Sequence, residues 1–322
     1  MLAASSLDEI VAARARIAGT TLRTPLVRLY VDAPAEIWLK LECLQPIGSF
    51  KLRGATNAMR RLAEEAPEQL SAGVYTASAG NMAQGVAWGA RALGIACTVV
   101  VPDTAPATKL AAIERLGARI DKRPFDAWWR VIAEHGDPRL PGTFLHPFAD
   151  NDVMAGNATI ALEIQEDLPN ARAILVPYGG GGLACGIAAG ARSVWPSHAP
   201  RVYACEVDSA SPLDVALRAG QPATASYVPS FVDGIGSKRV AEEMWPLVRT
   251  LLEGAIVVPV RAVADAVRLL VERARVVAEG AGAAAVAAAL TGQVKDGPIV
   301  CVVSGGNIDM SKLAAILRGE LP

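Results

Sequence analysis

Apolar residues along the chain follow two patterns that alternate from one end of the sequence to the other. In the first pattern they recur every three or four positions, as Leu52, Ala55 and Met59 do, which is typical of a helix with one buried face. Together with capping signals, this spacing predicts helices over residues 6–17, 51–65, 81–93, 108–116, 151–167, 263–279 and 281–290. Asn151 or Asp152 is the expected cap of the helix over 151–167.

The second pattern is a short apolar run that ends at a turn signal. Such runs predict buried strands over residues 37–41, 74–77, 96–101, 173–176, 202–205, 255–260 and 299–303. Strands that alternate with helices indicate βαβ units on parallel sheets that are buried on both faces. The sequence therefore predicts an α/β fold, and only the polar, proline-bearing segment 121–141 shows little regularity.

The composition is apolar enough to raise the question of a membrane protein. Hydrophobic residues make up 52% of the chain, charged residues 20%, and the mean hydropathy is +0.31. Residues 173–191 carry no charge, and a membrane-spanning helix needs about 20 apolar residues. However, Pro177 and four successive glycines interrupt this stretch, and a glycine costs about 1 kcal/mol in a helix relative to alanine. We therefore interpret it as a strand, a glycine loop and a helix beginning near Leu183, with no membrane partner.

Charge and the rarer residue types exclude several further classes. Lysine and arginine number 31 against 32 acidic residues, without a basic block, so no nucleic-acid partner is expected. The five cysteines form no close pair and the three histidines are isolated, which indicates neither a disulfide framework nor a histidine zinc centre. No signal peptide precedes the first helix, so a cytoplasmic protein is expected. At roughly 150 residues per domain, 322 residues predict about two domains.

Three loops at predicted strand ends or helix starts carry the candidate chemistry, because open α/β sheets bind ligands there. The first, PIGSFKLRG, places Lys51 at a helix start. A lysine there is ordinarily solvated, but Phe50 and Leu52 beside it favour desolvation, a lowered pKa and Schiff-base chemistry.

The second loop is the run Gly179, Gly180, Gly181, Gly182 and Leu183. Consecutive backbone N–H groups at a helix start form an anion cradle, and glycine lets a phosphate approach the backbone closely. The chain lacks both the lysine-ending P-loop pattern and GxGxxG in this loop, which argues against a nucleotide site. The third loop, VSGGN, follows the last strand and includes Ser304; taken alone, it is best interpreted as an ordinary turn.

Taken together, these motifs and their order resemble those of a known family. PIGSFKLRG, SAGNMAQG, HPFAD, VPYGGGGL, EVDSA, DGI and VSGGNID are similar to the motifs of fold-type II pyridoxal-phosphate enzymes, in the branch of threonine/serine dehydratases and serine racemases. The resemblance implies two open parallel-sheet α/β domains, as in the tryptophan synthase β-subunit, with pyridoxal 5′-phosphate between them. It implies a large domain of residues 1–63 plus 151–322, a small inserted domain of residues 64–150 that closes on the substrate, and a homodimer.

The resemblance also assigns roles to residues. Lys51 would form the covalent link to the cofactor and later take the Cα proton, while Gly179 to Leu183 would hold the phosphate. Phe50 would lie against the ring, Asn81 would hydrogen-bond the 3′-oxygen, and Ser304 would contact the pyridine nitrogen. The expected substrate-binding residues lie in and beside the SAGNM loop and are Ser78, Ala79, Gly80, Asn81, Met82 and Gln84.

The activity implied is β-elimination from an amino-acid substrate such as L-threonine or L-serine, giving a 2-oxo acid and ammonia. The alternatives are a dehydratase for a bulkier β-hydroxy amino acid such as a β-aryl serine, an amino-acid racemase, and another fold-type II β-replacement or γ-elimination enzyme. Two alternatives without turnover are a protein that only binds pyridoxal phosphate and a nucleotide-binding α/β module.

Some positions depart from the family pattern. Ala79 stands where the racemases carry a serine base, which argues against racemisation. Met82 replaces a histidine, so we expect either a changed packing contact or a less polar pocket for a larger β-substituent. Ile47 replaces a threonine before Gly48. The cation site of the racemases resembles Glu206 and Ala210 here, but Pro212 stands at the position of its second carboxylate. A magnesium or calcium ion would then be bound by Glu206, backbone carbonyls and water. The alternative is that Glu206 is a surface charge or a helix cap.

Overall fold

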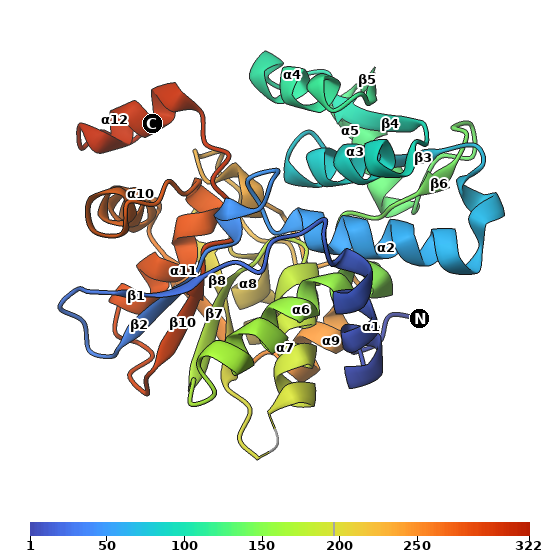
Figure 1. Ribbon diagram of the computed structural model, residues 1–322. Helices are drawn as coiled ribbons and strands as arrows, with labels where there is room; N and C mark the ends of the chain where they lie inside the picture. The colour runs from blue at the N-terminus through green and yellow to red at the C-terminus, as the bar shows by residue number, and fades with distance from the viewer. Residues whose placement is uncertain (196) are drawn as a thin grey trace.

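The computed structural model describes residues 1–195 and 197–322. It contains one sheet of six strands and one of four, each flanked by helices (Figure 1). The six-stranded sheet has the order β1-β2-β10-β7-β8-β9 and is parallel except for β1, which pairs antiparallel with β2. Its strands are β1 Leu26–Leu29, β2 Ile37–Lys40, β7 Ala173–Pro177, β8 Arg201–Val207, β9 Gly254–Val258 and β10 Ile299–Val302.

Helices cover both faces of this sheet, so its inner strands are apolar on both sides. The helices whose buried residues pack with one face are α10 Val260–Leu269, α11 Gly280–Leu290 and α12 Met310–Leu317. Those that pack with the other face are α6 Asn151–Asp167, α7 Gly182–Val194, α8 Pro212–Ala219 and α9 Trp245–Leu251. Helix α1, Leu7–Ile17, packs on α6 and is capped by the Ser6 hydroxyl, which accepts from the Glu9 N–H.

The four-stranded sheet has the order β5-β4-β3-β6 and is parallel throughout. Its strands are β3 Val74–Ala77, β4 Cys97–Pro102, β5 Arg119–Arg123 and β6 Thr143–Phe144, and its helices are α3 Asn81–Leu93, α4 Ala107–Arg115 and α5 Phe125–Ala133. Helix α2, Lys51–Glu65, contributes Ala55, Ala58 and Met59 to the core of this unit and also packs on α6. It runs between the two parts of the molecule (Figure 1). The domain boundaries at residues 63/64 and 150/151 stay a prediction.

The α/β architecture is confirmed, and the helices over 51–65, 81–93 and 151–167 have their predicted bounds. The cap of α6 is Asp150, one residue before the expected pair. The predicted helix over 263–279 is wrong in its second half: α10 continues into a π-helical turn, η4 Leu270–Ala274, and ends at Arg275, whose φ is 61°. Segment 121–141, which showed little regularity in the sequence, contains the end of β5 and the whole of α5.

The uncharged stretch 173–191 forms β7, the glycine loop and most of α7, as the sequence predicts. Within the described residues, none of the helices combines the length and the hydropathy that crossing a lipid bilayer requires.

Candidate active site

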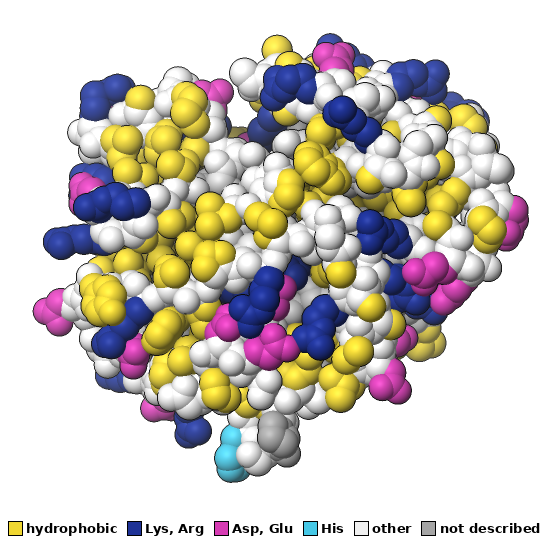
Figure 2. Space-filling model, in the orientation of Figure 1, with side chains coloured by type: hydrophobic (Ala, Val, Ile, Leu, Met, Phe, Trp, Pro, Cys, Tyr) yellow, Lys and Arg dark blue, Asp and Glu magenta, His cyan; other side chains and the backbone are white. Residues whose placement is uncertain are grey.

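Four loops meet at the carboxyl ends of parallel strands, where open α/β sheets bind ligands. They follow β2, β7 and β10 of the larger sheet and β3 of the smaller one. In the space-filling view the surface is hollowed between α12 and the part that contains the smaller sheet (Figure 2). Both backbone and side-chain contacts hold these loops together.

The loop after β10 is bonded to the loop that precedes α2. Ser49 and Gly305 form a β-bridge, the Phe50 N–H donates to the Ser304 carbonyl at 3.0 Å, and the Gly306 N–H donates to the Gly48 carbonyl at 2.9 Å. Gly48 has a φ of 74°, a conformation that favours glycine. These contacts place Ser304, which is 3% exposed, beside the start of α2.

Lys51 is the first residue of α2 and is half-buried. Its Nζ donates to the Pro147 carbonyl at 2.5 Å and lies 5.2 Å from the centre of the Phe50 ring. Burial disfavours the charged ammonium and lowers the pKa of Lys51 to about 8. A substantial fraction of this amine is therefore neutral near physiological pH, which a nucleophile or base requires.

The glycine loop lies at the start of α7, next to the Pro147–Phe148 segment that holds Lys51. A Cβ added to Gly180 would lie 2.2 Å from the Phe148 ring, and one added to Gly182 would lie 2.6 Å from the Phe148 carbonyl oxygen. In the described part of the chain, the backbone N–H groups of Gly179, Gly180 and Gly181 donate to no backbone carbonyl. Free N–H groups at the start of a helix fit a phosphate, because the helix dipole favours negative charge there.

Asn81, the first residue of α3, joins the loop after β3 to the other loops. Its Nδ2 donates to Glu279 Oε1 at 2.7 Å, and its Oδ1 accepts from Asn307 Nδ2 at 2.7 Å. Asn307 also donates to the Ile47 carbonyl at 2.8 Å. Sequence reasoning missed Glu279, because the helix predicted over 263–279 made it a helix end, whereas it directly precedes α11.

The remaining residues expected to bind substrate lie at the start of α3, but not all of them face the loops. Ser78, Gly80 and Gln84 are half-buried, and a Cβ added to Gly80 would meet no atom within 4 Å. Met82, by contrast, is 2% exposed and belongs to the core of the smaller sheet. Its position favours the interpretation of a changed packing contact over that of a pocket wall.

Comparison with known proteins assigns this arrangement to a family. Residues 17–305 match the family model described as pyridoxal-phosphate dependent enzyme. The chain belongs to this family. It is 37% identical to L-threonine ammonia-lyase of Thermotoga maritima over 98% of this chain and 79% of that protein. It is 36% identical to the catabolic L-threonine dehydratase TdcB of Staphylococcus aureus over 98% of this chain and 93% of that one.

Among solved structures, maize serine racemase superposes with a TM-score of 0.84 at 32% identity, covering 98% of each chain. These relatives place the chain among fold-type II pyridoxal-phosphate enzymes, in the branch of threonine/serine dehydratases and serine racemases. The free N–H groups of the glycine loop and the desolvated Lys51 amine fit this cofactor, the first its phosphate and the second its aldehyde.

The predicted cation site of this family member has a different local structure. Glu206, at the end of β8, is fully buried, and its two carboxylate oxygens accept from the N–H groups of Leu213 and Asp214, each at 2.8 Å. Glu206 thus caps α8, whose first residue is Pro212. Ala210 is also buried and forms a bridge with Tyr227. Both carboxylate oxygens thus already serve as acceptors within the fold, and the cation site stays a prediction.

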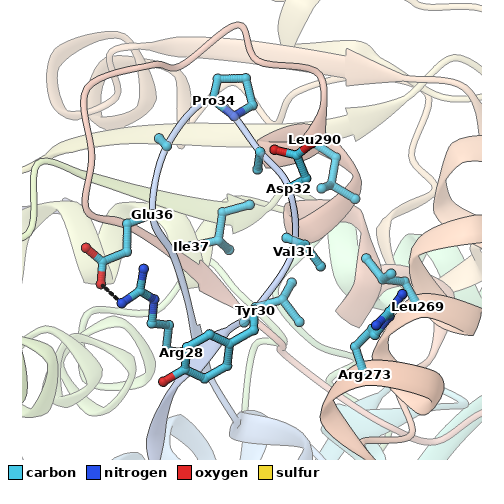
Figure 3. A pocket seen from close by; sticks show the side chains of 13 residues that line it. Arg28, Tyr30, Val31, Asp32, Pro34, Glu36, Ile37, Leu269, Arg273 and Leu290 are labelled. Atoms are coloured by element: carbon cyan, nitrogen blue, oxygen red, sulfur yellow. Dashed lines mark ion pairs between the residues drawn. The ribbon is translucent and has the colours of Figure 1, made fainter.

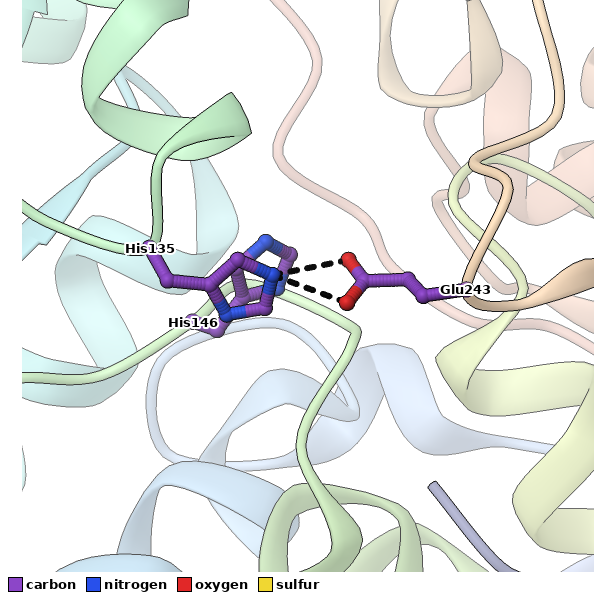
Figure 4. A group of neighbouring side chains, drawn as sticks. All are labelled: His135, His146 and Glu243. Carbon is purple, nitrogen blue, oxygen red and sulfur yellow. Dashed lines mark hydrogen bonds and ion pairs between the residues drawn. The ribbon is translucent and has the colours of Figure 1, made fainter. Parts of the chain in front are cut away.

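His135, His146 and Glu243 form a cluster beside the candidate active site, close to the Pro147–Phe148 segment (Figure 4). His135 Nε2 is 2.8 Å from Glu243 Oε2, and the two imidazole rings stack with centres 4.6 Å apart. A metal ion bound by two histidines lies in the plane of each imidazole ring. The stacked rings of His135 and His146 cannot both meet this condition unless one of them rotates. His146 Nδ1 already accepts from the N–H groups of Phe148 and Ala149, and burial lowers the pKa of His146 to about 3. The cluster therefore fits a contact between the segment after α5 and the segment before α9 rather than a metal site.

A surface pocket of about 770 Å³ lies between the β1–β2 turn and the α10–α11 region (Figure 3). Arg28 and Glu36, which both line it, form an ion pair of 3.4 Å. None of the residues predicted for the active site lines this pocket, so we assign the pocket no role in the reaction.

Proposed function

We propose that this chain is an ammonia-lyase that converts L-threonine or L-serine to a 2-oxo acid and ammonia. The observation that carries the proposal is the desolvated Lys51 amine, which donates to the Pro147 carbonyl next to the glycine loop. Relatives named L-threonine ammonia-lyase and L-threonine dehydratase, 36–39% identical over most of the chain, support the substrate class.

Pyridoxal 5′-phosphate, when bound, supplies an electron sink for the negative charge that forms on the substrate Cα. The glycine loop would hold its phosphate through backbone N–H groups, and Phe50 would lie against its ring. Asn81 would donate to the 3′-oxygen. The Ser304 hydroxyl would contact the pyridine nitrogen, and a hydroxyl, unlike a carboxylate, does not stabilise a protonated ring. This favours prompt loss of the β-hydroxyl over a long-lived carbanion.

Lys51 would take the Cα proton as general base. Its buried surroundings make the amine easier to deprotonate than that of an ordinary lysine, and the Pro147 carbonyl holds the Nζ position. The N–H groups at the start of α3, with Ser78 and Gln84 beside them, would bind the substrate carboxylate, because the N-terminus of a helix favours an anion. Movement of the smaller sheet toward the larger one would then exclude water.

A racemase is the second candidate, because serine racemases are among the structural relatives. Racemisation needs a proton donor on the cofactor face opposite to Lys51. Ala79 occupies the position where the racemases carry a serine base, and its methyl group has no proton to exchange. We therefore expect ammonia release to exceed interconversion of enantiomers.

The test compares wild type, Lys51→Ala and the control Lys295→Ala, in which an exposed lysine is removed. Wild type and the control should release 2-oxo acid and ammonia in equal amounts from L-threonine or L-serine. Lys51→Ala should lose at least about a hundredfold in kcat, because a positioned base contributes about 10²–10⁴-fold. Full activity in Lys51→Ala, or interconversion of enantiomers without ammonia release in wild type, would refute the proposal. A clear preference for a β-aryl serine over both substrates would instead identify the enzyme as a dehydratase for bulkier β-hydroxy amino acids.

We further propose that the enzyme is a cytoplasmic homodimer. Leu44, Val277 and Met310 are exposed apolar residues. Cys43, which precedes Leu44, lies near Val277, because a Cβ on Gly306 would contact both the Cys43 side chain and the Val277 carbonyl. Hydrophobic side chains also gather on the side of the molecule where α10–α12 lie (Figure 2). Light scattering should give twice the chain mass for wild type and a smaller value for Met310→Glu, whereas a monomeric wild type would contradict the dimer.

A further inference from the structure

Glu279 is a buried carboxylate without an ionic partner. It is 8% exposed, and none of the ion pairs in the described part of the chain includes it. Its Oε1 would lie 2.3 Å from a Cβ on Gly305, so the carboxylate packs directly on the backbone next to Ser304. A buried charge of this kind is costly unless it has a specific partner. Its side-chain partner in the structure is the amide of Asn81, and the backbone of Asn307 also contacts it.

The contacts of Asn81 leave only one group for the cofactor. Its Oδ1 accepts from Asn307, and one of its two Nδ2 protons goes to Glu279. The second Nδ2 proton is the one donor that remains. An inverted amide would place an oxygen against the Glu279 carboxylate and an NH₂ group against the Asn307 NH₂ group. Glu279 and Asn307 therefore fix which end of the Asn81 amide is a donor.

Few other titratable groups face Glu279 from the elements packed around it. They are Asp233 on the turn η3, Asp233–Ile235, Lys109 on α4 and Cys43 on the turn η1, Glu42–Leu44. Lys109 and Asp233 form an ion pair with each other at 2.6 Å, so their effects on Glu279 largely cancel. The Cys43 thiol is neutral near pH 7, because burial raises its pKa to about 12.

We propose that Glu279 is the positioning residue for Asn81: through its hydrogen bond it directs the free N–H of the amide at the 3′-oxygen of the cofactor. The inference rests on the proposed function, because it needs pyridoxal phosphate in the site. Glu279 also links α3, which belongs with the smaller sheet, to the start of α11 beside the larger one. Through this hydrogen bond, binding of the cofactor at Asn81 would also stabilise one position of the smaller sheet relative to the larger one.

The protonation state of Glu279 changes near neutral pH. Burial raises its pKa to about 7, and the hydrogen bond from Asn81 opposes this shift. Above that pH the carboxylate is ionised and is a strong acceptor for Asn81; below it the group is neutral and a weaker acceptor. The donor that faces the cofactor oxygen is therefore held more firmly at higher pH.

The experiment records the visible absorption band of the holoenzyme as a function of pH, together with the Kd for pyridoxal phosphate. The proteins are wild type, Glu279→Gln, Glu279→Ala and the control Glu272→Gln, whose carboxylate is exposed. Wild type and the control should show a spectral transition with a midpoint of about 7, and both Glu279 variants should lose it. The Gln variant keeps an acceptor for Asn81, so its Kd should stay within about threefold of wild type, whereas the Ala variant should bind about tenfold more weakly.

A transition that persists in Glu279→Gln, or an unchanged Kd in Glu279→Ala, would overturn the positioning role. Neither result would touch the proposed function, because Lys51 would still carry the cofactor. A wild-type protein that shows no visible band with added pyridoxal phosphate would contradict the proposed function itself. The two failures are therefore distinguishable.

Discussion

At the scale of single residues, the central feature is an amine whose burial favours its neutral form. The pKa of Lys51 falls from its ordinary value of 10.5 to about 8, because burial desolvates the ammonium. Only the neutral amine attacks an aldehyde. We therefore predict that the rate at which the apoprotein takes up pyridoxal phosphate rises with pH, with a midpoint of about 8.

Stopped-flow absorbance on the apoprotein at a series of pH values measures this rate. Lys295→Ala serves as the control and should leave the midpoint in place. A rate that keeps rising to about pH 10, as for an ordinary lysine, would contradict the desolvated environment of Lys51.

A second residue-scale prediction concerns the glycine loop that would bind the cofactor phosphate. Gly180→Ala would place a methyl group 2.2 Å from the Phe148 ring, so either the loop or the Pro147–Phe148 segment must move. We expect the affinity for pyridoxal phosphate to fall at least about tenfold and stability to fall by about 1–3 kcal/mol, as for other overpacked sites. Gly254→Ala is the matched control, because its new methyl group would meet no atom within 4 Å. Equal affinities in the two variants, measured by fluorescence titration, would show that the cradle does not depend on Phe148.

At the scale of elements, α2 is fixed by a buried network of charges that begins two residues after Lys51. Arg53 contacts Glu42 at 2.8 Å and Glu163 at 2.6 Å, and Glu163 also contacts Lys40. All four side chains are buried, with two positive and two negative charges in balance. The network joins α2 to β2, η1 and α6, and it thereby fixes the direction in which α2 presents Lys51.

Glu163→Gln should therefore be strongly destabilising. It leaves Lys40 and Arg53 without their shared partner, and an unpaired buried charge costs about 3–5 kcal/mol. Urea unfolding of wild type, Glu163→Gln and Glu65→Gln would measure the loss. Glu65 pairs with Arg61 at the surface, so its variant should stay within about 1 kcal/mol of wild type. Similar losses in both variants would refute a special role for the buried network.

The carboxylate of Glu206 leads to a prediction about α8. Both oxygens of this buried carboxylate already accept backbone N–H groups, so a magnesium or calcium ion would have to compete with these two hydrogen bonds. We expect Tm and activity to be the same with either cation and with a chelator. A clear rise in Tm with one cation, lost in Glu206→Gln, would restore the cation site that the family resemblance implies.

The sequence predicts an element correctly when the residues that determine its type and its ends lie within the element itself. Helix α2 and strand β3 were predicted to the residue, because their apolar spacing and their boundaries are both written in the local sequence. Strand β1 was missed, since it lies at a sheet edge and only its last residue, Leu29, is buried. Helix α5 was missed because prolines and charges flank it, and its stability rests on Val131 and Ile132 packing against the smaller sheet.

At the scale of the whole molecule, the candidate active site is built from loops that follow strands of both sheets. Motifs in the sequence predicted Lys51, the glycine loop and Asn81, because a lysine at a helix start and a run of glycines carry their chemistry locally. Glu279 and Asn307 could not be assigned roles in this way, since their contacts with Asn81 join positions about 200 residues apart. The burial of Met82 likewise depends on how α3 packs in three dimensions.

The most direct test of the account is to locate the cofactor on the chain. Purified holoenzyme is reduced with borohydride, which makes the link between a lysine and pyridoxal phosphate permanent, and its peptides are then mapped by mass spectrometry. The account predicts the modification on Lys51 alone, in wild type and in Lys295→Ala, and none in Lys51→Ala. Modification of another lysine, or no modified peptide in a wild-type protein saturated with the cofactor, would contradict it.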